Sequence, residues 1–133
     1  MKRRIIALFA LTALVILAAP TYAQSGCTSA TLKGSYGLSL NGSVGGVSTA
    51  AVGLVTADGE GNFSITYTIS ENGTVTTGEH AVGTYTVNAD CTGSVTDLTN
   101  NLHYTIVVLR HGAEGLIINR DPGSIYLGDF KKQ

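Results

Sequence analysis

The sequence predicts an all-β protein, an eight-stranded antiparallel up-and-down barrel, and three observations carry that prediction. After residue 23, no window places apolar residues at helical spacing for three turns, whereas alternation with a period of two recurs. Turn-forming pairs such as Asn-Gly separate the apolar runs. The clearest run is 63–70, in which odd-numbered residues are large and apolar and even-numbered residues are Ser or Thr. Such a strand has one dry face and one wet face.

Eight runs of this kind are expected to form consecutive strands: 32–40, 49–57, 63–70, 81–89, 94–98, 102–108, 116–120 and 125–130. The seven turns between them are expected at 41–42, 58–62, 72–73, 90–93, 100–101, 111–115 and 121–123. Residues 74–80 are interpreted as a loop or as the bulged start of the fourth strand, with Gly78 at the irregularity.

A β-sandwich is the alternative arrangement of the same strands. Closure into a barrel is favoured because it removes the unpaired strand edges that an open sheet of this size exposes. The interior of an eight-stranded barrel is either filled by side chains or holds one small ligand.

The N-terminus has the pattern of a cleavable signal peptide. Basic residues at 2–4 precede an apolar run at 5–19, and Thr21 and Ala23 are small residues at the two positions that a signal peptidase reads. A retained membrane anchor is disfavoured because the run is shorter than the roughly 20 residues of a spanning helix. We therefore expect a signal peptide at 1–23, a single β-barrel domain at 24–133, a secreted or periplasmic location, and no membrane span after the signal is removed.

The charge of residues 24–133 excludes some classes of partner. This part of the chain contains nine acidic and five basic residues. A net negative domain lacks the basic face that nucleic acid requires, and it has no polybasic patch for anionic lipid.

Two cysteines, Cys27 and Cys91, both lie in the part expected to be exported. An even number of cysteines in an oxidising compartment indicates a disulfide, with two free buried thiols as the alternative. In a meander of alternating strands, Cys27 before the first strand and Cys91 after the fourth lie at the same end of the barrel. The segment 27–30 is then expected to cross that end as a lid. The opposite end carries the loops 41–48, 70–80, 98–103 and 120–124, of which the first two are the longest.

Three segments carry a resemblance to known proteins: 32–37, with the sequence LKGSYG, 57–63, with ADGEGNF, and 83–93, with GTYTVNADCTG. Together they resemble small exported bacterial β-proteins of unassigned function, and the resemblance implies no activity. The Gly34-Ser35-Tyr36 opening also resembles lipocalin- and avidin-like barrels, although it lacks the tryptophan that those families place there.

Candidate binding residues fall into two groups. Four tyrosines lie on the apolar faces of their strands, and they either line a pocket or fill the core: Tyr36, Tyr67, Tyr85 and Tyr104. Polar candidates are expected at the long-loop end or at a strand end, either binding a ligand or forming a solvated rim: Glu79, His80, His103, Arg110 and Arg120.

No catalytic residues, metal ligands or cofactor are predicted. The turn 58–62 alternates oxygen ligands, but Phe63 and Ile69 stand where a calcium loop needs Gly and Glu, so a hairpin turn is the better interpretation. The sequence favours a non-catalytic barrel that binds a small apolar or amphipathic ligand or a surface partner. The alternative is a structural envelope or matrix module with a packed interior. A hydrolytic or isomerase-type enzyme is least favoured, because it requires Glu79, His80 and His103 to converge.

Overall fold

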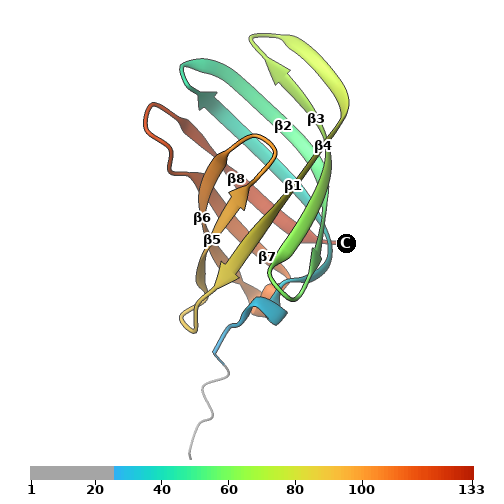
Figure 1. Ribbon diagram of the computed structural model, residues 1–133, viewed down its shortest axis with the longest axis vertical. Helices are drawn as coiled ribbons and strands as arrows, with labels where there is room; N and C mark the ends of the chain where they lie inside the picture. Colours follow the sequence, from blue (N-terminus) through green and yellow to red (C-terminus); the bar gives the residue numbers. More distant parts are fainter. Residues whose placement is uncertain (1–25) are drawn as a thin grey trace, which may run out of the picture.

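The computed structural model describes residues 26–133, which form a closed barrel of eight antiparallel strands joined in sequence order (Figure 1). The elements are η1 (Ser29–Thr31), β1 (Lys33–Val44), β2 (Val47–Asp58), β3 (Asn62–Glu71), β4 (Thr74–Val87), β5 (Thr92–Asp97), β6 (Leu102–Leu109), η2 (Arg110–Gly112), β7 (Glu114–Asn119) and β8 (Ile125–Lys132). The barrel closes where β8 pairs with β1. The predicted fold class is confirmed, whereas the predicted signal peptide lies outside the described residues. Within residues 26–133, no helix has the length and apolar character needed to cross a bilayer.

Strand alternation places the apolar residues inside the barrel. In β3, Phe63, Ile65 and Tyr67 line the interior, while Ser64 and Thr66 are exposed. The buried core continues around the barrel through residues such as Tyr36 and Ile106. A closed sheet that is apolar inside and paired on every strand needs no second layer to cover it.

The outer surface is less regular on one side of the barrel. Val107 of β6 pairs with Leu116 of β7, and Ile118 of β7 pairs with Leu127 of β8, and all four side chains are exposed. On this side, apolar side chains face outward as well as inward. The period-two pattern of apolar and polar residues is therefore weaker in the sequence of these strands.

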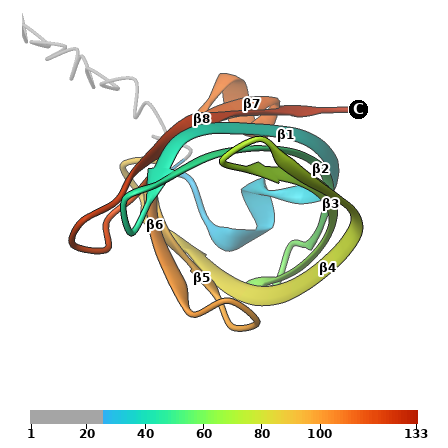
Figure 2. The same ribbon diagram turned by 90° about the horizontal axis from the view of Figure 1, so that it is seen from above.

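One end of the barrel is closed by the segment 27–32, which we call the floor. Figure 2 shows η1 crossing the barrel interior when the molecule is viewed along its long axis. Cys27 forms a disulfide with Cys91, with 5.0 Å between their Cα atoms, and its backbone N–H donates to Ala89 O at 3.2 Å. The predictions that the two cysteines form a disulfide and meet at one end, beside the segment that covers it, are confirmed.

The opposite end, formed by the turns at 45–46, 72–73, 98–101 and 120–124, is the mouth. The prediction of a turn at Asn41–Gly42 is wrong, because β1 continues to Val44 and the chain reverses at Gly45 and Gly46. At Gly42 the backbone φ is +138°, and an added Cβ would lie 1.8 Å from the Ile125 carbonyl oxygen. Gly42 therefore permits β1 to approach β8 closely and does not form a turn.

The long loops predicted at 41–48 and 70–80 are likewise extended hairpins with tight tips. β4 begins at Thr74, and its pairing register with β3 shifts between Tyr67 and Ile69, beside Gly78 at φ +72°. The interpretation of residues 74–80 as the bulged start of the fourth strand is confirmed.

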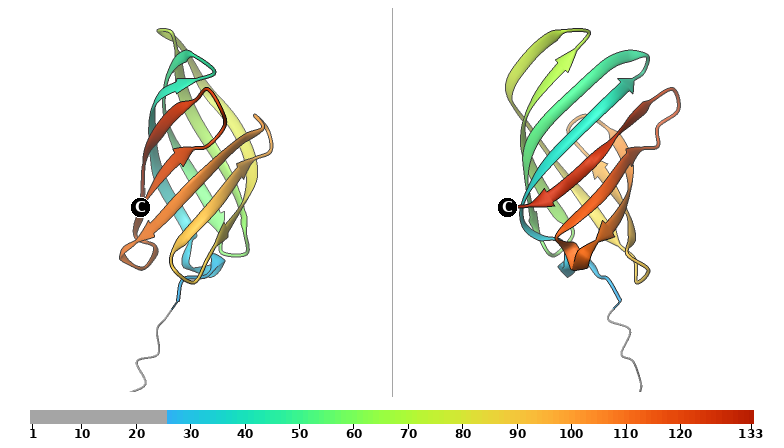
Figure 3. Two further views of the ribbon diagram at one scale, coloured as in Figure 1. Left: turned by 90° about the vertical axis from the view of Figure 1, so that its left-hand side faces the viewer. Right: turned by 180° about the vertical axis from the view of Figure 1, so that it is seen from behind.

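The wall of the barrel is higher on the β1–β4 side than on the β5–β8 side (Figures 1 and 3). β4 pairs with β5 only from Gly83 to Val87. Just above this ladder, Val82 contacts the β5–β6 turn through Leu98 and Thr99. The β4 segment 74–81 has no strand partner on its β5 side, so the mouth is cut obliquely.

Candidate functional site

The interior of the barrel holds a cavity of about 490 Å³. It extends from Leu32 and Ala57 at the floor to Glu71 and Asn100 at the mouth, and every strand contributes to its lining. Its volume lies within the range of roughly 300–1,000 Å³ that is typical of small-molecule sites.

The lining is mainly aliphatic and aromatic. Leu40 and Ile106 are buried in it, and Val55, Ile65 and Phe63 line it while remaining partly exposed. Small residues face the same space on β2, where Ala51 and Gly53 precede the larger Val55. Gly53 is closely packed by β3, because a Cβ at this position would lie 2.8 Å from the Tyr67 Cβ.

Two of the predicted tyrosines hold the floor in place. The Tyr85 hydroxyl donates to Leu32 O at 2.6 Å and accepts from Gly59 N–H at 2.9 Å. The Tyr36 hydroxyl donates to Gly112 O at 3.0 Å. Burial is the largest cause that raises the pKa of both phenols. Both tyrosines line the cavity with their rings, but their hydroxyls are committed to the fold.

The other two predicted tyrosines lie higher in the cavity, together with a third, Tyr126, that the sequence analysis missed. Tyr67 accepts a hydrogen bond from the Asn100 side-chain amide at 3.3 Å. Tyr104 is buried, and this burial, reinforced by Tyr126 and Asp97, raises the pKa of its hydroxyl above its usual range. Tyr126 lies on β8, where Gly128 and Phe130 share its inward face.

The Tyr126 hydroxyl is one of the polar groups of the cavity that form no hydrogen bond within the described residues. The residue is 3% exposed, and its hydroxyl has no hydrogen-bond partner among residues 26–133. Burial, and secondarily the nearby Tyr67 and Glu71, raises its pKa to about 12. The signal that identifies it is the Tyr126, Gly128, Phe130 alternation, which the apolar Ile125 and Leu127 on the other face conceal.

Three acidic side chains complete the upper lining: Glu71, Glu79 and Asp97. Asp97 is engaged locally, since its carboxylate accepts from the backbone N–H groups of Thr99 and Asn100, each at 2.9 Å. Glu71 and Glu79 make no ion pair or side-chain hydrogen bond within the described part of the chain. Lys, Arg and His do not occur among the residues that line the cavity.

The structure does not bring the remaining predicted site residues into the cavity. His80 lies on the outward face of β4, with its Nδ1 3.0 Å from Thr66 Oγ1, while its neighbour Glu79 faces inward. Arg110 lies in η2 at the floor end, where it is exposed and its Nε is 2.9 Å from Glu114 Oε1. Arg120 is exposed beside the mouth.

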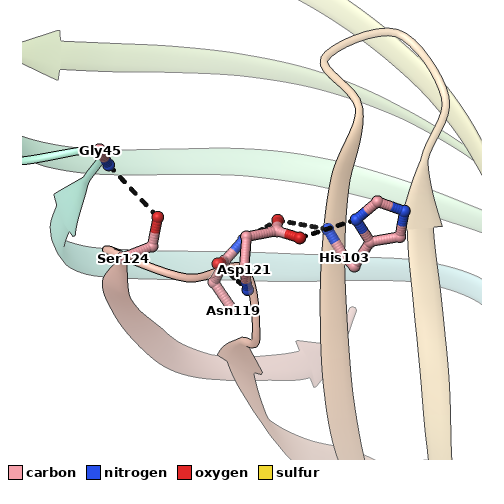
Figure 4. A network of polar contacts seen from close by, with 5 residues as sticks. All are labelled: Gly45, His103, Asn119, Asp121 and Ser124. Carbon is pink, nitrogen blue, oxygen red and sulfur yellow. Dashed lines mark hydrogen bonds and ion pairs between the residues drawn. The ribbon is translucent and has the colours of Figure 1, made fainter.

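His103 also lies outside the cavity, in a polar network that anchors the mouth (Figure 4). Its backbone N–H donates to Asp121 Oδ2 at 2.8 Å, and its Nδ1 lies 2.8 Å from Asp121 Oδ1. The hydrogen bond from the His103 N–H is the largest cause that holds the pKa of Asp121 below its usual value. Asn119 also donates to Asp121, and Gly45 N–H donates to Ser124, so the network ties the β7–β8 loop to β6 and to the β1–β2 turn. Glu79, His80 and His103 therefore do not converge.

The turn at 58–62 is organised by its own side chains. Asp58 Oδ1 accepts from the backbone N–H groups of Glu60 at 2.7 Å and Asn62 at 3.0 Å. These bonds satisfy the carboxylate within a hairpin turn. Across residues 26–133, no group of three or more His, Cys, Asp or Glu side chains is arranged to hold a metal ion.

Comparisons with known proteins support the fold alone. Neither the protein-family models nor the curated proteins yield a match to the chain. Among solved structures, the barrel is similar to a protein described as "De novo design of a fluorescence-activating beta barrel". The match has a TM-score of 0.50 and 12% identity, and it covers 79% of this chain and 96% of the designed protein. The resemblance to small exported bacterial β-proteins and to lipocalin- or avidin-like barrels stays a prediction. The chain is thus similar in fold to a designed β-barrel.

Proposed function

We propose that the protein is an exported, non-catalytic binding barrel that takes a small, largely apolar ligand into its interior through the mouth. The observation that carries the proposal is the cavity of about 490 Å³, lined mainly by apolar side chains and reaching the mouth. A ligand site of this kind combines apolar walls with a few polar groups that orient the ligand.

The cavity also weighs against the alternative of a structural module with a packed interior. Protein interiors are close-packed, and voids larger than a water molecule are few. A barrel of eight strands can be filled by its own side chains. The interior of this barrel instead retains a cavity of about 490 Å³, which is lined by Ala51 and by Tyr126, whose hydroxyl has no partner within the described residues.

Two further observations support the proposal. The designed barrel of similar fold is described as fluorescence-activating. The Cys27–Cys91 disulfide favours an oxidising compartment, in agreement with the signal peptide expected at residues 1–23.

Blocking the cavity tests the proposal. Nile red, an uncharged fluorescent probe, is titrated into the purified protein and into the Ala51→Phe variant, whose new ring projects into the cavity. The matched control is Ala50→Phe, because Ala50 is exposed on the outer face of the same strand. We expect Ala51→Phe to weaken binding at least about tenfold, because the new ring occupies space in which the probe would bury apolar surface. Ala50→Phe is expected to leave binding unchanged.

Equal binding by all three proteins would place the probe outside the cavity and contradict the proposal. Native mass spectrometry of protein purified from its own host provides a second measurement that needs no variant. A bound small molecule that Ala51→Phe fails to retain supports the proposal, and a ligand-free mass at every stage of purification counts against it.

A further inference from the structure

We propose that the cavity selects apolar ligands that carry a protonated amine at one end and disfavours the corresponding carboxylates. This inference rests on the proposed function and names the ligand class of the same site. It follows from the distribution of charge around the cavity and from the unpartnered hydroxyl within it.

The ionised side chains that line the cavity all carry the same sign. They are Glu71, Glu79 and Asp97, and no basic side chain shares the lining. The basic residues of the barrel lie elsewhere: Lys33, Arg110, Lys131 and Lys132 belong to elements at the floor end, and Arg120 is exposed outside the mouth. A carboxylate entering this space meets repulsion without a counter-ion, whereas an ammonium group meets attraction.

Two of the three carboxylates are available to a ligand. Asp97 is already saturated by Thr99 and Asn100. Glu71 and Glu79 carry no partner among the described residues. Glu79 pairs with Tyr67 across the β3–β4 ladder, and Glu71, which is exposed, lies four residues beyond Tyr67 on the same face of β3. Both belong to the tall wall, with Glu79 deeper in the cavity and Glu71 at the mouth, and we refer to the two together as the acidic pair.

The Tyr126 hydroxyl adds a neutral polar group to the cavity. The residue is 3% exposed and lines the cavity, and its hydroxyl has no partner among residues 26–133. No inaccessible side-chain polar atom of these residues lacks a hydrogen bond, so the unpartnered hydroxyl retains accessible surface and is open to a ligand. A phenol that stays neutral at pH 7 offers its oxygen to an ammonium N–H.

The depth of the cavity places the apolar part of the ligand. Below the acidic pair, the lining is dominated by aliphatic and aromatic side chains such as Leu38, Leu40 and Ile106. The ligand class is therefore an amphipathic amine, with an apolar body toward the floor and the ammonium group toward the acidic end of the cavity.

Three probes of equal chain length separate the head group from the apolar body: decylamine, decanol and decanoate. Each competes with Nile red at pH 7 in low salt, below its micelle concentration. We expect decylamine to bind about tenfold more tightly than decanoate, with decanol between them, because each partly exposed ion pair contributes a few-fold in affinity. High salt is expected to shrink the difference, since it screens exposed charges.

The matched variants are Glu71→Gln with Glu79→Gln, and Glu60→Gln with Glu114→Gln. Both double variants remove two negative charges, but Glu60 and Glu114 lie at the floor end and outside the cavity. The first is expected to reduce the preference for amine over carboxylate to within about twofold while leaving decanol unchanged, and the second is expected to keep the full preference.

The outcomes distinguish the two proposals. If decanoate binds as tightly as decylamine, amine selectivity is overturned while a binding barrel remains. The same conclusion follows if the preference for decylamine persists in the Glu71→Gln, Glu79→Gln variant and in high salt. If both double variants lose the preference equally, it arises from net charge and the site assignment is overturned. If neither Nile red nor any of the three probes binds, the proposed function itself fails.

Discussion

At the scale of single residues, the barrel uses the same side chain for two different purposes. The hydroxyls of Tyr36 and Tyr85 are bonded to backbone groups of the floor and of the neighbouring turns. The hydroxyl of Tyr126 faces the cavity without a partner in the described chain. The first kind contributes to stability, the second is assigned to the ligand in our proposal, and substitution by phenylalanine separates them.

Tyr85→Phe is expected to lower the free energy of unfolding by about 1–3 kcal/mol, because it leaves Gly59 N–H and Leu32 C=O without their partner at the floor. Tyr126→Phe is the matched control and is expected to change the free energy of unfolding by less than about 0.5 kcal/mol, since no hydrogen bond within the described fold is lost. Urea denaturation measures both values. An equal loss in the two variants would contradict the division between the tyrosines.

At the scale of the elements, the hairpin tips decide the shape of the mouth. Gly42 is placed in the β1–β8 pairing, where its Cα faces Tyr126, and β1 runs on to the tight turn at Gly45 and Gly46. The β1–β2 and β3–β4 hairpins consequently rise above the β5–β8 side. The taller wall carries Glu71 and Glu79 to the upper end of the cavity.

Gly42→Ala tests this role. Its Cβ would overlap the Ile125 carbonyl, and its backbone would remain at a φ of +138°, so β1 and β8 must separate locally. We expect a loss of more than about 3 kcal/mol in the free energy of unfolding. Gly46→Ala is the control, because Gly46 also has a positive φ but no atom lies within 4 Å of the added Cβ. It is expected to lose only about 1–2 kcal/mol. Thermal and urea unfolding of both variants measure these losses. Equal losses of unfolding free energy in the two variants would contradict the close approach of β1 to β8 at Gly42.

At the scale of the whole molecule, the disulfide joins the floor to the β4–β5 turn across a sequence separation of 64 residues. The floor segment itself is short, with η1 spanning three residues. Gly112 in η2 packs so closely on Thr31 that a Cβ at this position would lie 2.1 Å from the Thr31 carbonyl oxygen. The floor is therefore held by one covalent bond, by tyrosine hydroxyls and by close packing.

Replacing both cysteines by serine is expected to lower the free energy of unfolding by about 4 kcal/mol in the chain-entropy model, because the unfolded chain is no longer cross-linked. Neither Cys27 nor Cys91 belongs to a strand ladder, so the double variant is expected to keep its β-sheet circular dichroism spectrum at low temperature. Equilibrium unfolding of the parent protein with and without reductant measures the stability that the disulfide contributes. The variant is expected to unfold identically under the two conditions. An unchanged midpoint in the variant would contradict a stabilising role.

The sequence by itself determined the number and order of the strands, their antiparallel meander and the pairing of Cys27 with Cys91. These features follow from local signals: the period-two alternation in β3, the Gly-containing turns, and the parity of alternating strands, which places both cysteines at one end. The same local logic placed Tyr36, Tyr67, Tyr85 and Tyr104 on the inward faces.

Only the tertiary structure decided where the hairpins turn, which hydroxyls are already bonded, and how much space remains inside. Gly42 reads as a turn residue in the sequence, and its contact with Ile125 is between residues far apart in the chain. That Glu79 faces inward and His80 faces outward follows from the register of β4 after its bulge. The volume of the cavity depends on side chains that face each other across the barrel, and a pattern read along one strand contains no information about the opposite wall.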